Sequence, residues 1–499
     1  MSSIGYKLEN LDSISRYSMS STAKNFASIS AFQRDYQNII FLPAFRRLID
    51  KAQLFPMEQF DYVRTRLTHT LEVEAISEEI ISKICMHDHS LKNKKISYRE
   101  ISRCVALIHD IGNPPFGHYG EDIIKRYYSN RWGKLVVADE LIKQYGLKFK
   151  KVSALLKGPY ENDFKCFDGN AQSLRIVTNL SNINGYNNAN NLTAAVLGGM
   201  IKYPFDSSKD PEKQKFGFFQ SETEIVDFLR SQGTFIDGLN NPFSIIMEAA
   251  DDIAYFVSDI DDAIKKDIIT YEVFQNERKT FISNNSIKEG DKLLDFFSDF
   301  DKKYEKNQYD SSLPFKTTIQ RMLSSLRKDI IYSSVAFVLK ECAGFQNLNS
   351  SIMKGIRVLF KDENNNICGG FGAVFDFFDL LKKKYVFTFK SIISNELEGD
   401  TIMTFLLEEF SKAVLCVSFD VSPAGEIVVK ASKNKKYFHE EKTFRLISEH
   451  IVKTCARADG SAKDPSDHIY NRLKMVTDYL SGMTDSYAKY VYQLLSGAK

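Results

Sequence analysis

Apolar residues recur at the three- and four-residue spacing of amphipathic helices along most of this chain, and that spacing restricts the fold to a mainly α-helical class. The clearest stripes lie in residues 73–84, 101–108 and 245–256. A chain of 499 residues is too long for one ordinary hydrophobic core. We therefore expect several lobes, or one large helical body with insertions.

Local signals predict where the three helices begin and end. Ser97-x-x-Glu100 matches a capping box in front of the second stripe. The segment Gly112-Asn113-Pro114-Pro115 should end that helix soon after Asp110, because proline cannot continue a helix. Pro242 suits the first turn of the third helix, where its missing N–H costs nothing.

A few segments depart from the helical pattern. Residues 414–421 and 427–429 are rich in β-branched side chains and flank Pro423-Ala424-Gly425, which indicates a local β-hairpin. Their neighbours have helical patterns, so a continued helix is the alternative. Residues 181–193, which are rich in asparagine, and residues 361–372 are predicted to be surface loops.

Composition excludes some classes of protein. The 66 lysines and arginines nearly balance the 64 aspartates and glutamates, so there is no global field for nucleic acid or membrane, although a local basic pocket remains open. The seven cysteines form no CxxC pair, which predicts free thiols in a reducing compartment. Neither a signal-peptide core nor a long apolar span is visible. A cytoplasmic protein without a membrane segment is predicted.

Metal-ligating residue types occur on all three helices. His69 lies near the start of the first, His109 and Asp110 at the end of the second, and Asp251 inside the third. Two imidazoles and two carboxylates suit a divalent cation, and open positions would admit a phosphate oxygen and water. The alternative is a set of ordinary histidines and a solvated acidic pair. An unpaired carboxylate within residues 245–256 would be costly, which favours the metal and predicts a phosphohydrolase.

The loop after the second helix adds a second polar pair. His118 and Glu121 are three residues apart and share a face if a helix resumes there. A carboxylate that holds one imidazole nitrogen, with the other nitrogen facing substrate, is the arrangement of a general acid or base. The alternative is a hydrogen bond at a helix start with no catalytic role.

The third helix has features that suit a nucleoside phosphate. Asp251, Tyr255 and Asp259 recur at every fourth residue, which places a metal ligand, an aromatic ring and a second carboxylate on one stripe. This order suits a metal at the phosphate, a ring beside the sugar and a carboxylate at a sugar hydroxyl. The alternative makes Tyr255 a core residue and Asp259 a solvated one.

Two lysines in a less regular region are candidates for phosphate contacts. Lys202, which is followed by Tyr203, and Lys215 could bind phosphate oxygens as point charges. Most lysines are simply solvated, so their spacing alone does not separate the two possibilities.

The chain resembles a known family. The His…His-Asp…Asp set is the signature of the HD superfamily, and the surrounding strings resemble the bacterial deoxyguanosinetriphosphate triphosphohydrolase (dGTPase) family. The matching segments occur in the family's order and span nearly the whole chain. They are FLPAFRRLIDKAQLFP (41–56), VRTRLTHTLEV (63–73), IHDIGNPPFGHYGE (108–121), FDGNAQSLRIV (167–177), LGGMIKYP (197–204), IMEAADDIAYFVSDIDDA (246–263) and DYLSGMTDSYA (478–488).

The resemblance implies a helical HD-domain fold with an additional helical C-terminal region. It implies hydrolysis of dGTP, and of other dNTPs in some members, to deoxynucleoside and inorganic triphosphate by water attack at the α-phosphate. Mg²⁺ or Mn²⁺ is the expected cofactor. The implied metal ligands are His69, His109, Asp110 and Asp251, and the implied catalytic pair is His118 and Glu121.

The resemblance also implies residues that contact the substrate. Gln53 matches a position near the guanine and deoxyribose, and Asn170 lies in the GNAQ string, which FDGNAQ carries here in place of FEGNAQ. The deoxy preference would come from steric exclusion of a 2′-hydroxyl. The remaining expected contacts, with phosphate or sugar, are Arg66, Lys202, Tyr203, Lys215, Tyr255 and Asp259.

Domain organisation and partners follow from the same comparison. We predict a catalytic core with an N-terminal arm in residues 1–270, a helical insertion in residues 271–400 and a C-terminal helical region in residues 401–499. A homo-oligomer is expected, with a hexamer ahead of a tetramer, and single-stranded DNA is a candidate effector.

Two other functions compete with dNTP triphosphohydrolysis. An HD phosphodiesterase or nucleotidase would act on monophosphates or cyclic nucleotides with the same metal ligands. A nucleotide-sensing or nucleic-acid-binding protein would keep the HD site in vestigial form. All four metal positions are filled here, which counts against a degenerate site.

Overall fold

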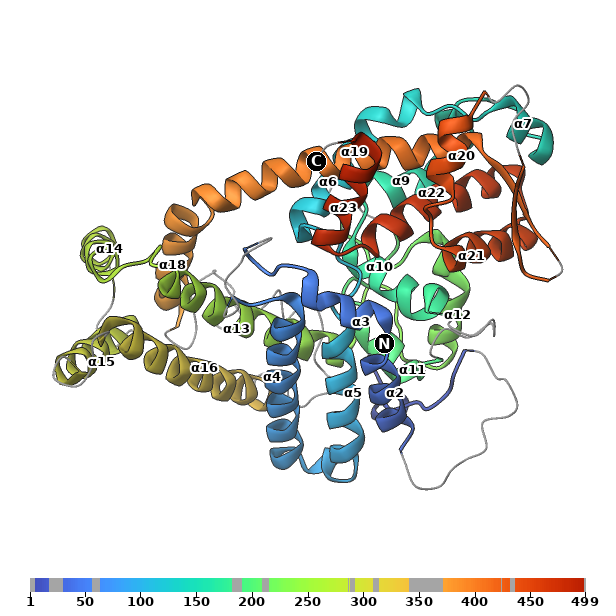
Figure 1. The fold of residues 1–499 in the computed structure, drawn as a ribbon. Helices are drawn as coiled ribbons and strands as arrows, with labels where there is room; N and C mark the ends of the chain where they lie inside the picture. The colour runs from blue at the N-terminus through green and yellow to red at the C-terminus, as the bar shows by residue number, and fades with distance from the viewer. Residues whose placement is uncertain are drawn as a thin grey trace.

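A computed structural model describes most of the chain. The described residues are 5–17, 30–55, 63–181, 191–208, 215–285, 287, 292–307, 314–340, 371–422, 424–430 and 436–497. Within them, the regular structure is helical apart from one two-stranded antiparallel hairpin and isolated bridges (Figure 1). The prediction of a mainly α-helical fold is confirmed.

The first half of the chain is a series of helices that ends with the long helix α13, against which α4, α5 and α11 pack. The helices of this half are α1 (Leu8–Leu11), α2 (Ala31–Ile40), α3 (Pro43–Arg47), η1 (Leu48–Asp50), α4 (Arg66–His87), η2 (His89–Lys94), α5 (Lys95–Ile108), α6 (Gly117–Arg131), η3 (Trp132–Lys134), α7 (Asp139–Tyr145), α8 (Val152–Leu155), α9 (Pro159–Lys165), α10 (Gly169–Arg175), the π-helical η4 (Ile176–Leu180), α11 (Ala194–Met200), η5 (Gln220–Glu222), α12 (Thr223–Ser231) and α13 (Pro242–Lys265).

The second half forms a helical arm at one side and a second lobe (Figure 1). Its elements are α14 (Tyr271–Asn284), α15 (Lys292–Asn307), α16 (Pro314–Lys340), α18 (Gly372–Leu381), the π-helical η7 (Lys382–Val386), α19 (Lys390–Cys416), β1 (Ser418–Val421), β2 (Ile427–Lys430), α20 (Phe438–Phe444), α21 (Glu449–Gly460), α22 (Pro465–Ser481) and α23 (Asp485–Ser496).

Helices α4, α5 and α13 form the frame that holds the site. Helices α4 and α5 lie side by side, and α13 packs against both (Figure 1). The apolar stripes predicted from the sequence face this packing and are buried. The hydroxyls of Ser77 and Ser102 meet between α4 and α5 at 2.6 Å, so the polar atoms in this interface are paired.

The predicted helix start is confirmed for α13 but not for α5. Asn241 caps α13 by accepting a hydrogen bond from the Phe243 N–H at 3.0 Å, and Pro242 is the first helical residue. Helix α5 begins at Lys95, because the 3₁₀ turn η2 runs directly into it. Ser97 is therefore a half-buried residue of the first turn, and the predicted capping box is wrong. The helix ends at Ile108, as Gly112–Pro115 predicted.

Two apolar cores share the fold, and the loop of residues 109–116 connects them. The first core packs α4, α5, α11 and α13 and continues into α14, α15, α16 and α18. The second packs α6–α9 against α19–α23. Ile111 belongs to the first core and Phe116 to the second. Residues 109–118 thus lie where the two cores meet.

The predicted hairpin is present. Strands β1 and β2 pair in antiparallel register with Phe419 opposite Val429. Residues 414–416 belong instead to the end of α19, so the strand is shorter than its β-branched run. Phe419 is buried against Phe444, with ring centroids 5.2 Å apart, because the hairpin covers α20.

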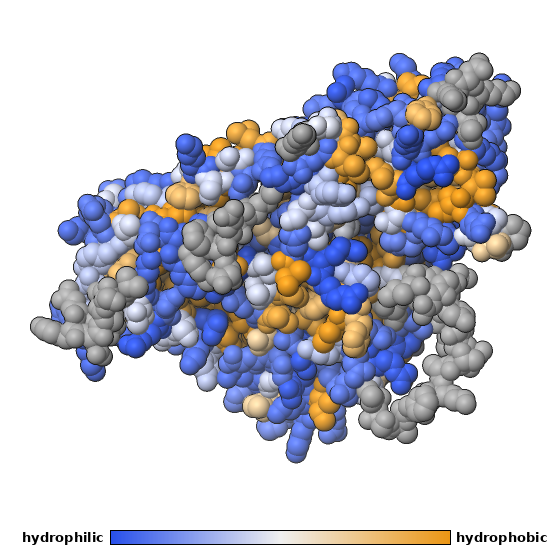
Figure 2. All heavy atoms as spheres, in the orientation of Figure 1, coloured by the Kyte–Doolittle hydropathy of each residue, from blue (hydrophilic) through white to orange (hydrophobic). Residues whose placement is uncertain are grey.

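Other predictions meet the structure only in part. Of the two predicted loops, residues 182–190 and 361–370 lie outside the described residues, and Gly372 begins α18. The predicted domain boundaries stay predictions; the first core crosses residue 270, and residue 400 falls within α19. The five described cysteines are free thiols, as expected. Among the described residues, every helix is too short or too polar to cross a membrane. Polar residues cover most of the face in Figure 2.

Candidate active site

The four predicted metal ligands converge in the structure. Ligand atoms of His69, His109 and Asp110 all lie within 4.8 Å of one another. Asp251 joins them, since its Oδ1 lies 2.9 Å from the His69 Nε2 and 3.8 Å from the His109 Nε2. Each ligand comes from the expected element: His69 from the first turn of α4, His109 and Asp110 from the end of α5, and Asp251 from the middle of α13.

The tautomer of His109 prepares it to bind a cation. Its Nδ1 lies 2.7 Å from the carbonyl oxygen of Ala106, which can only accept, so Nδ1 carries the proton. Nε2 therefore presents a lone pair. This buried atom has no hydrogen-bond partner among the described residues, and it lies 3.6 Å from the Asp110 Oδ1. A lone pair that faces two carboxylates fits a divalent cation, which would satisfy all three groups.

The two carboxylates are held in their charged form. Burial raises the pKa of Asp110, but the neighbouring His109 ring and the Arg66 guanidinium outweigh burial and leave that pKa well below the usual range. The Arg66 guanidinium also forms a close ion pair with the Asp110 Oδ2. Burial likewise raises the pKa of Asp251, while the His69 hydrogen bond and the neighbouring His109 ring lower it to about 2. Ionised carboxylates are the form that binds a metal.

A cavity of about 430 Å³ opens beside this cluster, large enough for a nucleotide-sized ligand. Half of the predicted site residues line it. They are Gln53, Arg66, Asp110, His118, Lys202, Asp251 and Tyr255. His69 and His109 are buried behind this surface.

His118 and Glu121 form the predicted pair on the first turn of α6. The His118 Nδ1 lies 3.5 Å from the Glu121 Oε2, and the Glu121 Oε1 accepts a hydrogen bond from the Gly169 N–H at 3.1 Å. The Glu121 side chain is 2% exposed, whereas that of His118 is 75% exposed and faces the cavity. The Glu121 hydrogen bond and charge raise the pKa of His118, so this imidazole is more basic than a free one.

The glycine before this pair leaves room for the Arg66 side chain. Gly117 has a φ of 60°, and a Cβ at this position would lie 2.3 Å from the Arg66 Nη2. A side chain here would displace the arginine that pairs with Asp110. Phe116 adopts a left-handed φ of 62°, which is uncommon for a residue with a side chain, and its N–H donates to the Asp485 Oδ1 at 3.0 Å.

The structure places four predicted substrate contacts away from the cavity wall. Lys215 lies behind Glu121, with its Nζ 3.4 Å from the Asp168 Oδ2, and Asn170 donates from Nδ2 to the Asp168 Oδ1 at 2.8 Å. Tyr203 does not line the cavity either. Asp259 is buried, and burial raises its pKa to about 7. Their contacts with substrate remain predictions.

Several cavity residues were missed by sequence reasoning. Asp252 was passed over because the sequence analysis chose the adjacent Asp251 as the metal ligand. The others come from α19 and the turn before it, far along the chain from the motifs, and no local signal marks them. They are Phe387, Ile392, Asn395 and Glu396. Lys382 was also missed; its Nζ lies 4.4 Å from the centroid of the Tyr255 ring and 3.8 Å from the Asp259 Oδ2.

Gly112 makes the tightest backbone approach in the loop that carries His109. Its N–H donates to the Ser173 Oγ at 2.9 Å, and the same hydroxyl donates to the His109 carbonyl at 3.1 Å. A Cβ at Gly112 would lie 2.2 Å from the Gly169 carbonyl oxygen, so the backbone would have to move. We expect Gly112→Ala to lower Tm by several degrees, since overpacking costs about 1–3 kcal/mol, and to weaken Mn²⁺ binding.

Differential scanning fluorimetry and Mn²⁺ titration would measure both effects. Gly133→Ala is the control, because a Cβ there meets open space and should leave both quantities unchanged. A Gly112→Ala variant that matched the parent in Tm and in Mn²⁺ affinity would show that the loop is not held as the structure describes.

Known proteins with similar sequences identify the family. Residues 66–161 match the HD domain family. This range ends before Asp251 and contains His69, His109, Asp110, His118 and Glu121. A deoxyguanosinetriphosphate triphosphohydrolase-like protein of Listeria innocua is 30% identical over 489 residues, covering 95% of this chain and 96% of the relative.

Two relatives carry the enzyme's name itself. A deoxyguanosinetriphosphate triphosphohydrolase of Cronobacter sakazakii is 28% identical and covers 93% of both chains. One of Yersinia pseudotuberculosis is 26% identical and covers 96% of both chains. Because a relative at 30% identity matches almost end to end, the resemblance seen in the motifs holds across the whole chain. The chain belongs to the deoxyguanosinetriphosphate triphosphohydrolase family of HD-domain proteins.

Proposed function

We propose that this protein is a metal-dependent triphosphohydrolase that converts dGTP, and other dNTPs more weakly, to deoxynucleoside and inorganic triphosphate. The observation that carries the proposal is the buried lone pair of the His109 Nε2, which faces Asp110 and Asp251 at the wall of a nucleotide-sized cavity. The names of the relatives in Cronobacter sakazakii and Yersinia pseudotuberculosis support the choice of substrate.

His69, His109, Asp110 and Asp251 would hold Mg²⁺ or Mn²⁺. The ion would polarise the phosphate oxygens and lower the pKa of water. Arg66 and Lys202 both line the cavity and supply positive charge for the phosphates. Lys202 keeps its charge there, since Glu248 and Tyr203 outweigh burial and raise its pKa.

His118 is assigned as the general acid. Water attacks the α-phosphorus, and the bond that breaks joins this phosphorus to the 5′-oxygen of the deoxynucleoside. That oxygen must gain a proton as it leaves. Glu121 holds the Nδ1 of His118 and raises the pKa of the ring, so the imidazole keeps its proton to a higher pH than a free one, with Nε2 free to donate.

Tyr255 is assigned to the sugar. Its ring lines the cavity near Asp251, where a flat face would leave no room for a 2′-hydroxyl. Asp259 sits behind it, close enough for the Tyr255 hydroxyl to lower the pKa of the Asp259 carboxyl, and Lys382 lies over the same ring. We therefore propose that Asp259 orients Tyr255 and acts on the sugar through it.

Glu396 is assigned to the base. A carboxylate can accept hydrogen bonds from N1 and the exocyclic amine of guanine, whereas adenine offers an acceptor at N1. We expect Glu396→Gln to reduce the preference for dGTP over dATP in kcat/KM by about tenfold, because a hydrogen bond to a charged group contributes about 1.5–3 kcal/mol. Competition assays with both nucleotides would measure the ratio.

Glu398→Gln is the matched control for this experiment. Glu398 lies on the same helix but pairs with the Lys489 Nζ at 2.7 Å and does not line the cavity. Its replacement should leave the ratio unchanged. An unchanged ratio in Glu396→Gln would remove this residue from base recognition.

Product analysis tests the proposal as a whole. Each of the four dNTPs is incubated with the protein and Mg²⁺ or Mn²⁺, and the phosphate products are separated. Intact triphosphate, released fastest from dGTP, supports the assignment. Orthophosphate or a nucleoside monophosphate would instead favour an HD nucleotidase or phosphodiesterase, and no metal-dependent turnover would favour a sensor. Light scattering would test the expected homo-oligomer, and adding single-stranded DNA would test the expected effector.

A further inference from the structure

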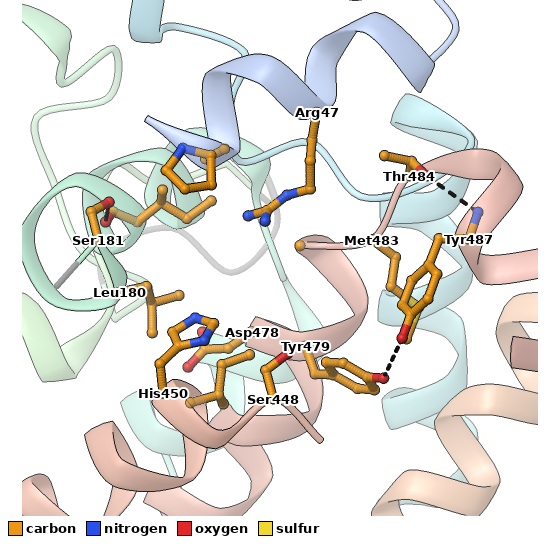
Figure 3. Close-up of a pocket in the computed structure, with 15 residues that line it drawn as sticks. Arg47, Leu180, Ser181, Ser448, His450, Asp478, Tyr479, Met483, Thr484 and Tyr487 are labelled. Carbon is orange, nitrogen blue, oxygen red and sulfur yellow. Dashed lines mark hydrogen bonds between the residues drawn. The ribbon is translucent and has the colours of Figure 1, made fainter. Parts of the chain in front are cut away.

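A second cavity of about 540 Å³ lies outside the proposed active site (Figure 3). It is enclosed by α3, η4, the start of α21 and the turn that joins α22 to α23. Its walls come from both apolar cores: Ile176 belongs to the first core, and Ile451 and Met483 to the second. The volume is typical of a site for a small organic ligand.

A cation without a counterion points into this cavity. The Arg47 guanidinium extends from α3 into the space between Leu180 and Met483 (Figure 3). Arg47 is half-buried, and no acidic group among the described residues forms an ion pair with it. Burial and the positive charge of Arg46 both lower the pKa of its guanidinium. A partly desolvated cation in this state gains from an anionic ligand.

The acid in the cavity wall is already neutralised. The Asp478 carboxylate accepts hydrogen bonds from the Arg175 Nε at 2.7 Å and Nη2 at 2.8 Å, and from the Gln172 Nε2 at 3.0 Å. His450 stands at the rim, where burial and the nearby charge of Arg47 lower its pKa. The wall therefore offers one unpaired positive charge and a neutral imidazole that can also hydrogen-bond.

The rest of the cavity suits a flat apolar body. Its apolar lining includes Leu180, Ile451, Tyr479 and Met483. The hydroxyls of Tyr479 and Tyr487 approach each other at 3.3 Å, which holds both rings in place (Figure 3). Aromatic and thioether groups pack well against a planar ring.

We propose that this cavity binds a small organic anion, an aromatic ring that carries a phosphate or a carboxylate, with the anionic group on Arg47 and the ring between Leu180 and Met483. We further propose that the bound ligand acts on the proposed active site, and this second part rests on the function proposed above.

Hydrogen bonds, one of them direct and the others through Lys51, connect the cavity wall to the loop that carries the proposed metal ligands. The buried Lys51 Nζ donates to the Ser481 carbonyl at 2.7 Å and to the Asn113 carbonyl at 2.5 Å. The Asp485 carboxylate accepts from the Ala52 and Phe116 N–H groups, both at 3.0 Å. The turn between α22 and α23 thus holds both ends of residues 113–116. A ligand that orders this turn also orders that loop.

Calorimetry on the full chain in EDTA tests the binding. Phenyl phosphate and benzoate are the probes, with inorganic phosphate and phenol as partial ligands that lack the ring or the charge. We expect saturable binding of at least one probe and weaker binding of both partial ligands. The probe that binds more tightly identifies the anionic group that the cavity prefers. Arg47→Met should weaken the binding by about tenfold, equivalent to about 1.4 kcal/mol, and Arg47→Lys should restore part of it.

Arg46→Met is the matched control, because Arg46 is exposed and does not line the cavity. It should change the affinity by less than about twofold, or about 0.4 kcal/mol. No saturable binding of either probe, or equal losses in the Arg46 and Arg47 variants, would overturn the site.

Hydrogen exchange tests the connection to the loop. The probe should slow amide exchange in peptides that cover residues 109–117 and 481–487, and this protection should be absent in Arg47→Met. Binding without protection of residues 109–117 would overturn the second part of the proposal. Neither experiment contains a dNTP or a metal, so an error in the proposed function would leave both results unaffected.

Discussion

Replacing His109 with alanine is expected to lower kcat/KM for dGTP by about a thousandfold or more, with a matching loss of Mn²⁺ affinity. The His109 Nε2 presents its lone pair to Asp110 and Asp251 because its Nδ1 is held by the Ala106 carbonyl. The alanine side chain offers no nitrogen to a metal ion, so the cluster loses one of its proposed ligands. Triphosphate release and Mn²⁺ titration would measure the two losses, and circular dichroism would confirm that the variant is folded.

His89→Ala is the control for a histidine outside the site, since His89 is exposed in η2. It should keep both activity and metal affinity. Treatment with EDTA should abolish turnover in the parent protein, and Mg²⁺ or Mn²⁺ should restore it. Undiminished turnover in His109→Ala, or activity that survives EDTA, would refute the metal assignment.

Glu121→Gln is expected to lower kcat by about a hundredfold or more, with a smaller effect on KM. The amide keeps the hydrogen bond that the Oε1 accepts from Gly169, so the fold is retained. It loses the negative charge that raises the pKa of His118. The general acid acts in its protonated form, which is present below that pKa. With a lower pKa, the proton is lost earlier, and the alkaline limb of the kcat profile should move to lower pH.

Measuring kcat from acid to alkaline pH separates this role from a merely structural one. Asp122→Asn is the matched control, because Asp122 is the exposed neighbour on the same helix and should leave the profile in place. His118→Ala should remove the alkaline limb that depends on the imidazole. An alkaline limb at the same pH in Glu121→Gln and in the parent would contradict the assignment of His118 as the acid.

A buried lysine, Lys51, supports the proposed active site from behind. Lys51 is 2% exposed, and burial lowers the pKa of its ammonium to about 7. It remains in place because two backbone carbonyls accept its hydrogen bonds. This residue lies two positions before Gln53 in the chain, so the same segment serves the cavity wall of the proposed active site and the support beneath it.

The sequence by itself determined the three central helices and the metal cluster. The spacing of apolar residues defines which face of a helix is buried, and His69, His109 and Asp251 lie at or near such faces. A helix start signalled by local chemistry, such as the one at Pro242, was also predictable because it depends on neighbouring residues alone. The start of α5 was not, because a preceding 3₁₀ turn replaced the expected cap.

Only the tertiary structure decided which distant segments meet these helices. Asn395 and Glu396 reach the cavity because α19 crosses from one core to the other, and no periodicity in their own segment reports that path. Lys215 and Asn170 face Asp168 behind Glu121 for the same reason. Local spacing specifies the face that a residue occupies, whereas the packing of whole helices decides which faces come together. The proposed metal ligands could be predicted because each belongs to a local pattern, whereas most of the other cavity residues could not.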